Sequence, residues 1–359
     1  MSDDIQISQK GAWGVITLTR EKALNALSID MCAAIDKALS QWALDDAVKA
    51  VLVEGQGEKA FCAGGDIKWM YQVGREDPAA AAQFFRVEYQ MNVRIAAFPK
   101  PYVALMDGIC MGGGVGISMN ASHRIVTERT IWAMPECAIG LIPDVGATYM
   151  LPRLPGGLGR YLGLTGARLK GADCLSAEVA SHFTQNERLP ALREALLALD
   201  LGSDPSTQIS EAVASYHEGQ PGDLIESLHL IDQLFDRKED LPHLMERLRT
   251  DPSKLAEKAL FALKTSSPTS LHLTHHMLSD PSPSFVEALA REFCVAAHLM
   301  EGPDFHEGVR AQMIDKDRLP QWSPSKINDV TADSIKRYFQ TPSDGPLDLS
   351  SVRAQSRQE

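Results

Sequence analysis

Two carboxylates in one apolar segment are the side chains of this sequence best suited to chemistry. Glu136 and Asp144 each follow a proline directly, within a stretch (131–146) whose other side chains are apolar or small. A carboxylate among such neighbours is either hydrogen-bonded within the structure or made reactive by the loss of water. The pair suits attack on a carbonyl carbon, with one group acting as base or nucleophile and the other orienting water or protonating.

Two glycine-rich turns offer a second chemical device. Residues 61–66 (FCAGGD) and 107–116 (DGICMGGGVG) each follow a strand-like run and precede a helical pattern. Backbone N–H groups at the start of a helix are free and point outward with a favourable dipole. Neither turn has the spacing of a phosphate loop or of a dinucleotide fingerprint. If the turns converge, their N–H groups form an oxyanion hole for a carbonyl oxygen; otherwise each is an ordinary tight turn.

These turns, together with residues 22–27 (KALNAL), resemble the signature segments of the crotonase superfamily, also called the enoyl-CoA hydratase/isomerase superfamily. The resemblance implies a thioester oxygen held by the backbone N–H groups of Gly65 and Gly113. CoA would then be part of the substrate, and neither a separate cofactor nor a metal is expected. The resemblance assigns CoA binding to six positions: Lys22, Ala23, Leu24, Ala63, Asp66 and Ile67.

A longer motif narrows the resemblance to the 3-hydroxyisobutyryl-CoA hydrolase branch of this superfamily. Residues 134–146 read MPE-x-x-IG-x-x-PD-x-G, residues 304–311 (DFHEGVRA) add a match, and the likeness runs from Gly14 to about Phe339. It implies hydrolysis of 3-hydroxyisobutyryl-CoA to 3-hydroxyisobutyrate and CoA in valine degradation, with Glu136 and Asp144 as catalytic residues. The implied substrate-binding residues are Glu88, Gly113, Glu136 and Asp144.

One glycine separates this reading from a hydratase. In the resemblance, the first of the two glutamates that hold water in hydratases falls at Gly116, which has no side chain, and Glu136 matches the second. A single acid does not reproduce that pair, so we favour hydrolysis, with attack by Glu136 preferred over its action as a general base. Two alternatives stay open: an enoyl-CoA hydratase or isomerase acting on short acyl-CoA, and a non-catalytic CoA-binding scaffold on the same fold.

Alternating strand and helix patterns predict an α/β core that positions these residues. Strand-like runs at 13–19, 48–54, 102–106 and 124–127 alternate with helical stretches such as 79–97. Ser28 is a helix cap for apolar residues that recur at helical spacing, namely Met31, Ile35, Leu39 and Trp42. Repeated units of this kind imply largely parallel sheets, and the resemblance adds a crotonase-type superhelix of ββα units.

Strand signals fade after about residue 178. The helical patterns that follow are 189–199, 208–217, 224–235, 241–248, 252–264 and 284–300. We therefore predict a crotonase-like α/β core with the CoA and catalytic site over 1–180 and a helical C-terminal region over 181–340. The polar residues 341–359 are predicted to be a flexible tail.

Bulk composition limits the partners of the chain. Its 359 residues carry a formal net charge of −12, which disfavours nucleic-acid binding and attraction to anionic membranes. No run of about 18 apolar residues is present, and residues 1–9 resemble no targeting signal. The six scattered cysteines form no CxxC pair and fit reduced thiols, so a cytoplasmic protein is expected. The superfamily commonly forms trimer-based assemblies, and a homo-oligomer is left open.

Overall fold

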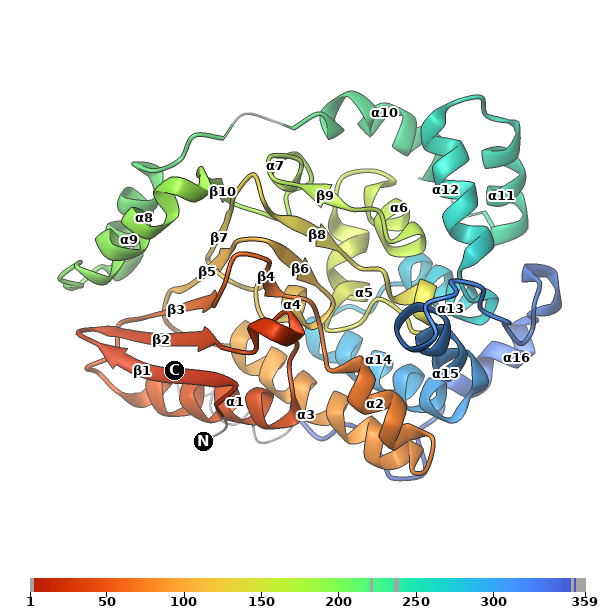
Figure 1. The fold of residues 1–359 in the computed structure, drawn as a ribbon, viewed down its shortest axis with the longest axis horizontal. Coiled ribbons are helices and arrows are strands. Elements are labelled where there is room, and N and C mark those ends of the chain that lie inside the picture. Colours follow the sequence, from red (N-terminus) through yellow and green to blue (C-terminus); the bar gives the residue numbers. More distant parts are fainter. Residues whose placement is uncertain (1–2, 220–221, 236–238, 350–351, 353–359) are drawn as a thin grey trace.

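The computed structural model describes residues 3–219, 222–235, 239–349 and 352. Its strands form a six-stranded sheet in the order β1-β2-β3-β5-β7-β10 and a four-stranded sheet in the order β4-β6-β8-β9 (Figure 1). The strands are β1 (Ile5–Lys10), β2 (Trp13–Leu18), β3 (Ala50–Gly55), β4 (Ala60–Cys62), β5 (Tyr102–Met106), β6 (Ile109–Met111), β7 (His123–Val126), β8 (Ile131–Ala133), β9 (Leu169–Lys170) and β10 (His182–Phe183).

Successive strand pairs build the predicted superhelix. The pairs β3/β4, β5/β6 and β7/β8 each give their first strand to the six-stranded sheet and their second to the four-stranded sheet. Within each sheet these strands pair in parallel with those of the next turn. The glycine-rich segments follow the short second strands β4 and β6, so both reach the same end of the four-stranded sheet.

Both faces of the six-stranded sheet are covered, which explains its continuous apolar strands. In β3, Val51 and Val53 face the main core, whereas Ala50 and Leu52 face a second apolar cluster. This alternation is the period of two expected of a strand. The second cluster is closed by α8 and α9, which lie at the opposite side of the molecule from α10–α12 (Figure 1).

Most predicted helices are present with small changes at their ends. Ser28 caps α1 through the Met31 N–H, and the four apolar residues predicted for this helix are buried. The helices are α1 (Ile29–Leu44), α2 (Ile67–Gly74), α3 (Pro78–Ala96), α4 (Gly113–Gly116), α5 (Ala147–Met150), α6 (Leu158–Thr165), α7 (Asp173–Ser176), α8 (Leu189–Leu197), α9 (Pro205–Ala214), α10 (Leu224–Phe235), α11 (Leu241–Thr250), α12 (Lys254–Thr265), α13 (Pro268–Ser279), α14 (Phe285–Glu301), α15 (Pro303–Val309) and α16 (Ala332–Lys336).

Strand β1 and helix α13 are among the elements whose ranges were not predicted from the sequence. Strand β1 is polar because it lies at a sheet edge, and most of its side chains stay partly or fully exposed. Helix α13 begins at Pro268, and a proline is well suited to the first position of a helix. Ser267 caps this helix by accepting a hydrogen bond from the Ser270 N–H.

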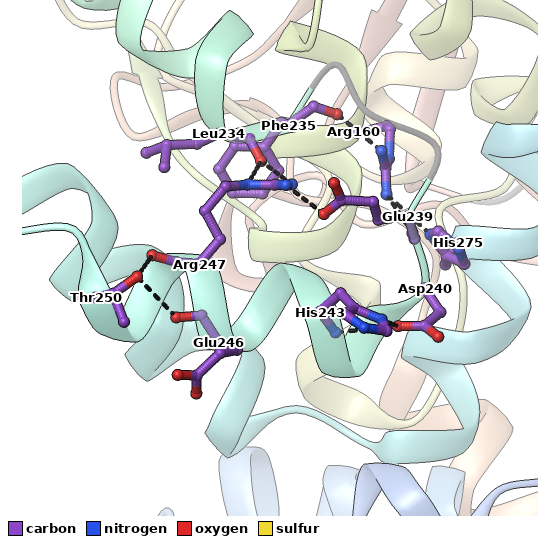
Figure 2. A network of polar contacts seen from close by, with 10 residues as sticks. All are labelled: Arg160, Leu234, Phe235, Glu239, Asp240, His243, Glu246, Arg247, Thr250 and His275. Atoms are coloured by element: carbon purple, nitrogen blue, oxygen red, sulfur yellow. Dashed lines mark hydrogen bonds and ion pairs between the residues drawn. The ribbon is translucent and has the colours of Figure 1, made fainter.

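Two arginines hold the corner between α10 and α11 (Figure 2). Arg247 donates to the Leu234 carbonyl and pairs with Glu239, and Arg160 donates to the Phe235 carbonyl. These bonds satisfy carbonyl groups that the end of a helix leaves without partners. Arg160 also contacts His275 of α13, so this side chain links the end of α10 to α13.

Part of the predicted tail is held in place, in contrast to the flexibility expected for 341–359. Arg86 of α3 donates to the carbonyl oxygens of Asp344, Gly345 and Pro346 and forms an ion pair with the Asp344 side chain. Leu347 and Leu349 are buried against the core. Apolar burial and a charged donor therefore fix residues 344–349, while 350–351 and 353–359 lie outside the described residues.

Candidate active site

A cavity of about 400 Å³ lies where the two glycine turns, helix α3 and the C-terminal region meet. Most of the predicted site residues line it, although they come from distant parts of the sequence. The lining residues are Ala63, Gly64, Gly65, Ile67, Met70, Phe84, Phe85, Glu88, Met111, Gly112, Gly113, Pro135, Glu136, Ala138, Ile139, Leu141, Asp144, Arg168, Gln312 and Met313.

The two glycine turns converge. A Cβ atom placed on Gly64 would lie 3.7 Å from the Gly113 nitrogen, so the backbones of the turns are in contact. Gly64 has a φ of +116° and Gly112 a φ of +50°, both in the region that side chains disfavour. Each of these glycines directly precedes a predicted donor, Gly65 in the first turn and Gly113 in the second.

The N–H groups of Gly65 and Gly113 are left outside the regular backbone pairing. The bridge between Leu27 and Gly65 uses the N–H groups of Leu27 and Asp66. Gly113 is the first residue of α4, where a helix does not use its N–H groups. Both groups therefore remain available to a ligand oxygen in the cavity.

Three carboxyl side chains surround this point. Glu136 begins a 3₁₀ turn (Glu136–Ile139), Glu88 lies in α3, and Asp144 stands in the loop before α5. A Cβ atom placed on Gly112 would lie 3.0 Å from Oε1 of Glu136, and one placed on Gly113 would clash with Oε1 of Glu88. Glu136 and Glu88 therefore lie against the second glycine turn, Asp144 lines the same cavity, and all three carboxyl groups are buried.

The electrostatics of this set favour bound protons. Burial, and then the charges of Asp144 and Glu136, raise the pKa of Glu88 well above its usual value. Burial and the charge of Asp144 likewise raise the pKa of Glu136. Burial raises the pKa of Asp144 only to about 6, because hydrogen bonds from Tyr89 and from its own backbone stabilise the charged form. At neutral pH, Asp144 is thus the member of the set that most readily carries charge.

Tyr89 and Glu292 were not predicted as site residues. The Tyr89 hydroxyl donates to Oδ2 of Asp144 at 2.7 Å. Glu292 of α14 accepts from the N–H groups of Gly146 and Thr148 at 2.7 and 3.0 Å, and from the Thr148 hydroxyl at 2.6 Å. These contacts fix the loop that follows Asp144, in which Val145 and Gly146 both have positive φ. Tyr89 stands beside Glu88 in the sequence, but nothing local marks Glu292.

This geometry can be compared with known proteins. The model of the family described as enoyl-CoA hydratase/isomerase matches residues 13–339. The chain belongs to the enoyl-CoA hydratase/isomerase family. The predicted superfamily and its fold are therefore confirmed.

The named relatives of this family member are of two kinds. It is 44% identical to a Xenopus tropicalis protein named 3-hydroxyisobutyryl-CoA hydrolase, mitochondrial, over 96% of this chain and 90% of the other. The human protein of that name is 40% identical, over 95% and 89%. A solved structure titled enoyl-CoA hydratase from Rhodobacter sphaeroides is similar with a TM-score of 0.88 and 41% identity, over 96% and 100%. One titled carnitinyl-CoA dehydratase, from Mycobacterium thermoresistibile, has a TM-score of 0.90 and 35% identity, over 97% and 99%.

In this family member the two segments assigned to CoA lie side by side. Leu24 accepts from the Ala63 N–H at 3.0 Å, and Leu27 donates to the Gly64 carbonyl at 2.8 Å. Ala63 and Ile67 line the cavity, whereas Lys22, Ala23 and Leu24 lie beside it and are not among its lining residues. The Asp66 carboxylate caps α2 at Trp69 and pairs with Arg20, so it is already engaged within the protein. The role of these residues toward CoA stays a prediction.

The C-terminal region also contributes to the cavity of this family member. Gln312 and Met313, in a π-helix (Arg310–Ile314) that continues α15, form part of the wall. The matched motif at 304–311 stops one residue before Gln312, so the sequence indicated the region but not the side chain. Arg168, another residue that we did not predict, lies exposed at the cavity.

The described part of this family member holds neither a metal-binding cluster of side chains nor a membrane-spanning helix. No group of three or more His, Cys, Asp or Glu side chains there is arranged to hold a metal ion. Among the helices described, none combines the length and apolar character needed to cross a membrane.

Proposed function

We propose that this protein hydrolyses the thioester of 3-hydroxyisobutyryl-CoA to 3-hydroxyisobutyrate and free CoA. The observation that carries the proposal is its identity of 40–44% with hydrolases of that name over nearly the whole chain. The cavity supports the same reaction, because three buried carboxyl groups line it together with the two glycine turns, whose backbones are in contact. That combination suits a carbonyl whose oxygen gains negative charge while its carbon is attacked.

The first step begins with the thioester oxygen between the N–H groups of Gly65 and Gly113. Glu136 attacks the carbonyl carbon, the C–S bond breaks, and its electron pair leaves with the CoA sulfur as a thiolate, which takes a proton from solvent water. Water then attacks the acyl carbon of the mixed anhydride and restores the Glu136 carboxylate. Attack needs the charged form of Glu136, and its pKa is raised. The reactive fraction, and with it the rate, should therefore increase with pH until Glu136 is fully charged.

The other two carboxyl groups have separate roles in this scheme. Asp144, held by Tyr89, orients water and accepts its proton, because its pKa of about 6 leaves it largely charged at neutral pH. Glu88 receives the hydroxyl of the acyl group, and its Oε1 atom has no partner among the described atoms. A buried group that needs such a partner discriminates strongly against acyl groups lacking the hydroxyl.

A second candidate, hydration of short enoyl-CoA, is favoured by the similar solved structure that is titled enoyl-CoA hydratase. The geometry at Gly116 speaks against a second acid there. A Cβ atom on Gly116 would lie 2.8 Å from both Nδ2 of Asn92 and Cβ of Val145, so a side chain does not fit without movement. A non-catalytic scaffold is disfavoured by the strain and desolvation that this cavity maintains.

One panel of substrates separates these functions. 3-Hydroxyisobutyryl-CoA, isobutyryl-CoA and crotonyl-CoA are each incubated with the protein, while a thiol reagent reports CoA and absorbance reports the enoyl group. We expect thiol release from 3-hydroxyisobutyryl-CoA at the highest kcat/KM and no loss of the crotonyl-CoA absorbance. Loss of that absorbance without release of thiol would establish a hydratase. No turnover of any thioester would favour the non-catalytic scaffold.

The covalent step has its own test. Hydroxylamine added during turnover should capture the acyl group from the anhydride, and a single turnover in oxygen-18 water should be followed by mass spectrometry of the peptide that contains Glu136. Label in that carboxylate would establish the attack. Failure of the trap, with no burst of CoA when deacylation is slowed, would instead make Glu136 a general base.

The biological setting is proposed on the same basis. 3-Hydroxyisobutyryl-CoA hydrolysis belongs to valine degradation, in which we propose that this protein acts. The names of the relatives describe those proteins as mitochondrial. For this chain we propose a cytoplasmic location. Fractionation of the source cells would decide it.

A further inference from the structure

Phe84 is an aromatic residue of the cavity wall to which the reaction scheme above gives no role. It lies in α3 with 1% of its surface exposed, and it lines the cavity. A Cβ atom placed on Gly65 would lie 2.7 Å from Cζ and 2.8 Å from Cε1 of this ring. The ring therefore occupies the space that a side chain at Gly65 would fill, beside one of the two N–H groups proposed to hold the thioester oxygen.

The same face of α3 meets both donor glycines. Glu88 lies four residues after Phe84, which is one helical turn further along the helix. A Cβ atom placed on Gly113 would clash with Oε1 of Glu88, as one placed on Gly65 would clash with the Phe84 ring. An acyl group whose carbonyl oxygen lies between the two donors therefore meets an aromatic ring and a carboxyl group side by side.

The lining of the cavity is buried in one part and open to solvent in another. Phe84, Phe85 and Glu88 are at most 2% exposed, whereas Arg168 is exposed and Gln312 is half-buried. CoA is far larger than a cavity of about 400 Å³, so it must extend past the exposed residues into solvent. The acyl group, at the other end of the thioester, is therefore directed toward the buried part of the lining.

Neighbouring side chains hold the Phe84 ring in place. Phe85 packs against it edge to face, with ring centroids 5.9 Å apart, and the Tyr89 ring lies 5.8 Å from Phe85 in turn. Cε of Met70 would lie 3.3 Å from the Cβ atom placed on Gly65, so it closes the space beside the ring. Because such close packing leaves little room for movement, the ring forms a fixed wall of the cavity.

We propose that Phe84 determines which acyl groups the protein accepts, by packing on the alkyl branch of the α-carbon while Glu88 binds the hydroxymethyl branch. The proposal rests on the proposed thioester hydrolysis, whose acyl group carries one methyl and one hydroxymethyl branch on that carbon. A methyl group fits against the ring, whereas a longer alkyl branch would have to displace it. The substrates selected are therefore thioesters of 3-hydroxy acids with a short alkyl branch at the α-carbon.

The test compares Phe84→Ala and Phe84→Leu with a matched control, Phe235→Leu. Phe235, in α10, is likewise fully buried, but it is not among the residues that line the cavity. The substrates are CoA thioesters of 3-hydroxypropionic acid that carry either a methyl or a butyl group on the α-carbon.

We expect the wild type to cleave the butyl substrate with a kcat/KM at least about 100-fold below that of the methyl substrate. Phe84→Ala should lose about tenfold on the methyl substrate and gain at least about tenfold on the butyl substrate, because the branch then enters the space of the ring. Phe84→Leu should change both values in the same directions by less, and the control should keep the wild-type ratio.

The other outcomes overturn the proposal. An unchanged ratio between the two substrates in a folded variant would show that the ring supports the cavity without selecting the acyl group. A wild type that cleaves both substrates equally well would exclude a limiting wall. If neither variant folds, a crystal structure of the wild type with a non-hydrolysable thioether analogue decides: the alkyl branch should lie within about 4.5 Å of the Phe84 ring, and a longer distance refutes the contact. Failure of the wild type to release thiol from either substrate would instead refute the proposed function itself.

Discussion

Two buried acidic regions of this protein differ in how their oxygens are satisfied. At the cavity, Glu88 and Glu136 each keep an oxygen without a partner among the described atoms. Directly behind it, Glu292 accepts three hydrogen bonds from the 146–148 loop. Both regions are desolvated, and burial raises the pKa in both. The difference indicates which carboxyl groups are built into the fold and which are kept for a ligand.

Glu136→Gln is expected to have the largest effect, because it keeps the shape of the side chain and removes its charge. We expect kcat for thiol release to fall on the order of 10³-fold, because neither attack nor base catalysis survives. CoA binding, measured by calorimetry, should be retained. Near-normal hydrolysis by a variant with an unchanged melting temperature would contradict the assignment.

Glu88→Ala is expected to have a smaller and selective effect. Loss of the buried partner for the acyl hydroxyl should lower kcat/KM for 3-hydroxyisobutyryl-CoA by about 10- to 100-fold, because a buried polar group left without its hydrogen bond costs about 1–3 kcal/mol. The slower cleavage of isobutyryl-CoA should change less, since that substrate has no hydroxyl to bind. Equal losses on both substrates would point to folding or to a general catalytic role.

Glu292→Gln tests the carboxyl group whose oxygens are already hydrogen-bonded within the protein. The glutamine cannot accept all three bonds equally well, so the loop after Asp144 should loosen and kcat should fall by about tenfold, with KM nearly unchanged. Glu54→Gln is the matched control, because Glu54 is held by Arg193 and Thr17 away from the cavity. If both variants lost stability and neither changed in kcat, the role of Glu292 would be structural only.

The same variant also tests the pKa of Glu292, through the pH dependence of the free energy of unfolding. Burial raises the pKa of Glu292 to about 8 in the folded protein, so the proton is held more tightly there than in the unfolded chain. This stabilising contribution is present at low pH and is lost as pH rises through 8. Between pH 7 and 9 the wild type should lose about 1 kcal/mol relative to Glu292→Gln, as measured by urea unfolding. A constant difference would show that Glu292 is already charged at pH 7.

The sequence predicted those parts of the site that local pattern determines. Glu136, Asp144 and the glycines at 65 and 113 stand in short motifs, because a turn that frees an N–H and a proline-flanked acid are each encoded within a few residues. The helix of Glu88 was also predicted, as the helical stretch 79–97.

The supporting contacts could not be predicted in that way. Tyr89 reaches Asp144 across 55 residues, and Glu292 reaches Thr148 across 144. Such pairs depend on how α3 and α14 pack, and neither side chain carries a local signal of its partner. Phe84 became informative only once its contact with Gly65 was known, since a phenylalanine within a helix is by itself ordinary packing.

The contact between Arg86 and the segment 344–346 has a consequence for how the protein is made. Its carbonyl partners lie up to 260 residues later in the chain, so they are synthesised long after α3. Helix α3, which carries Glu88 and Tyr89, therefore emerges from the ribosome well before it gains this outer support. A nascent chain that stalls before residue 344 would present α3 without it.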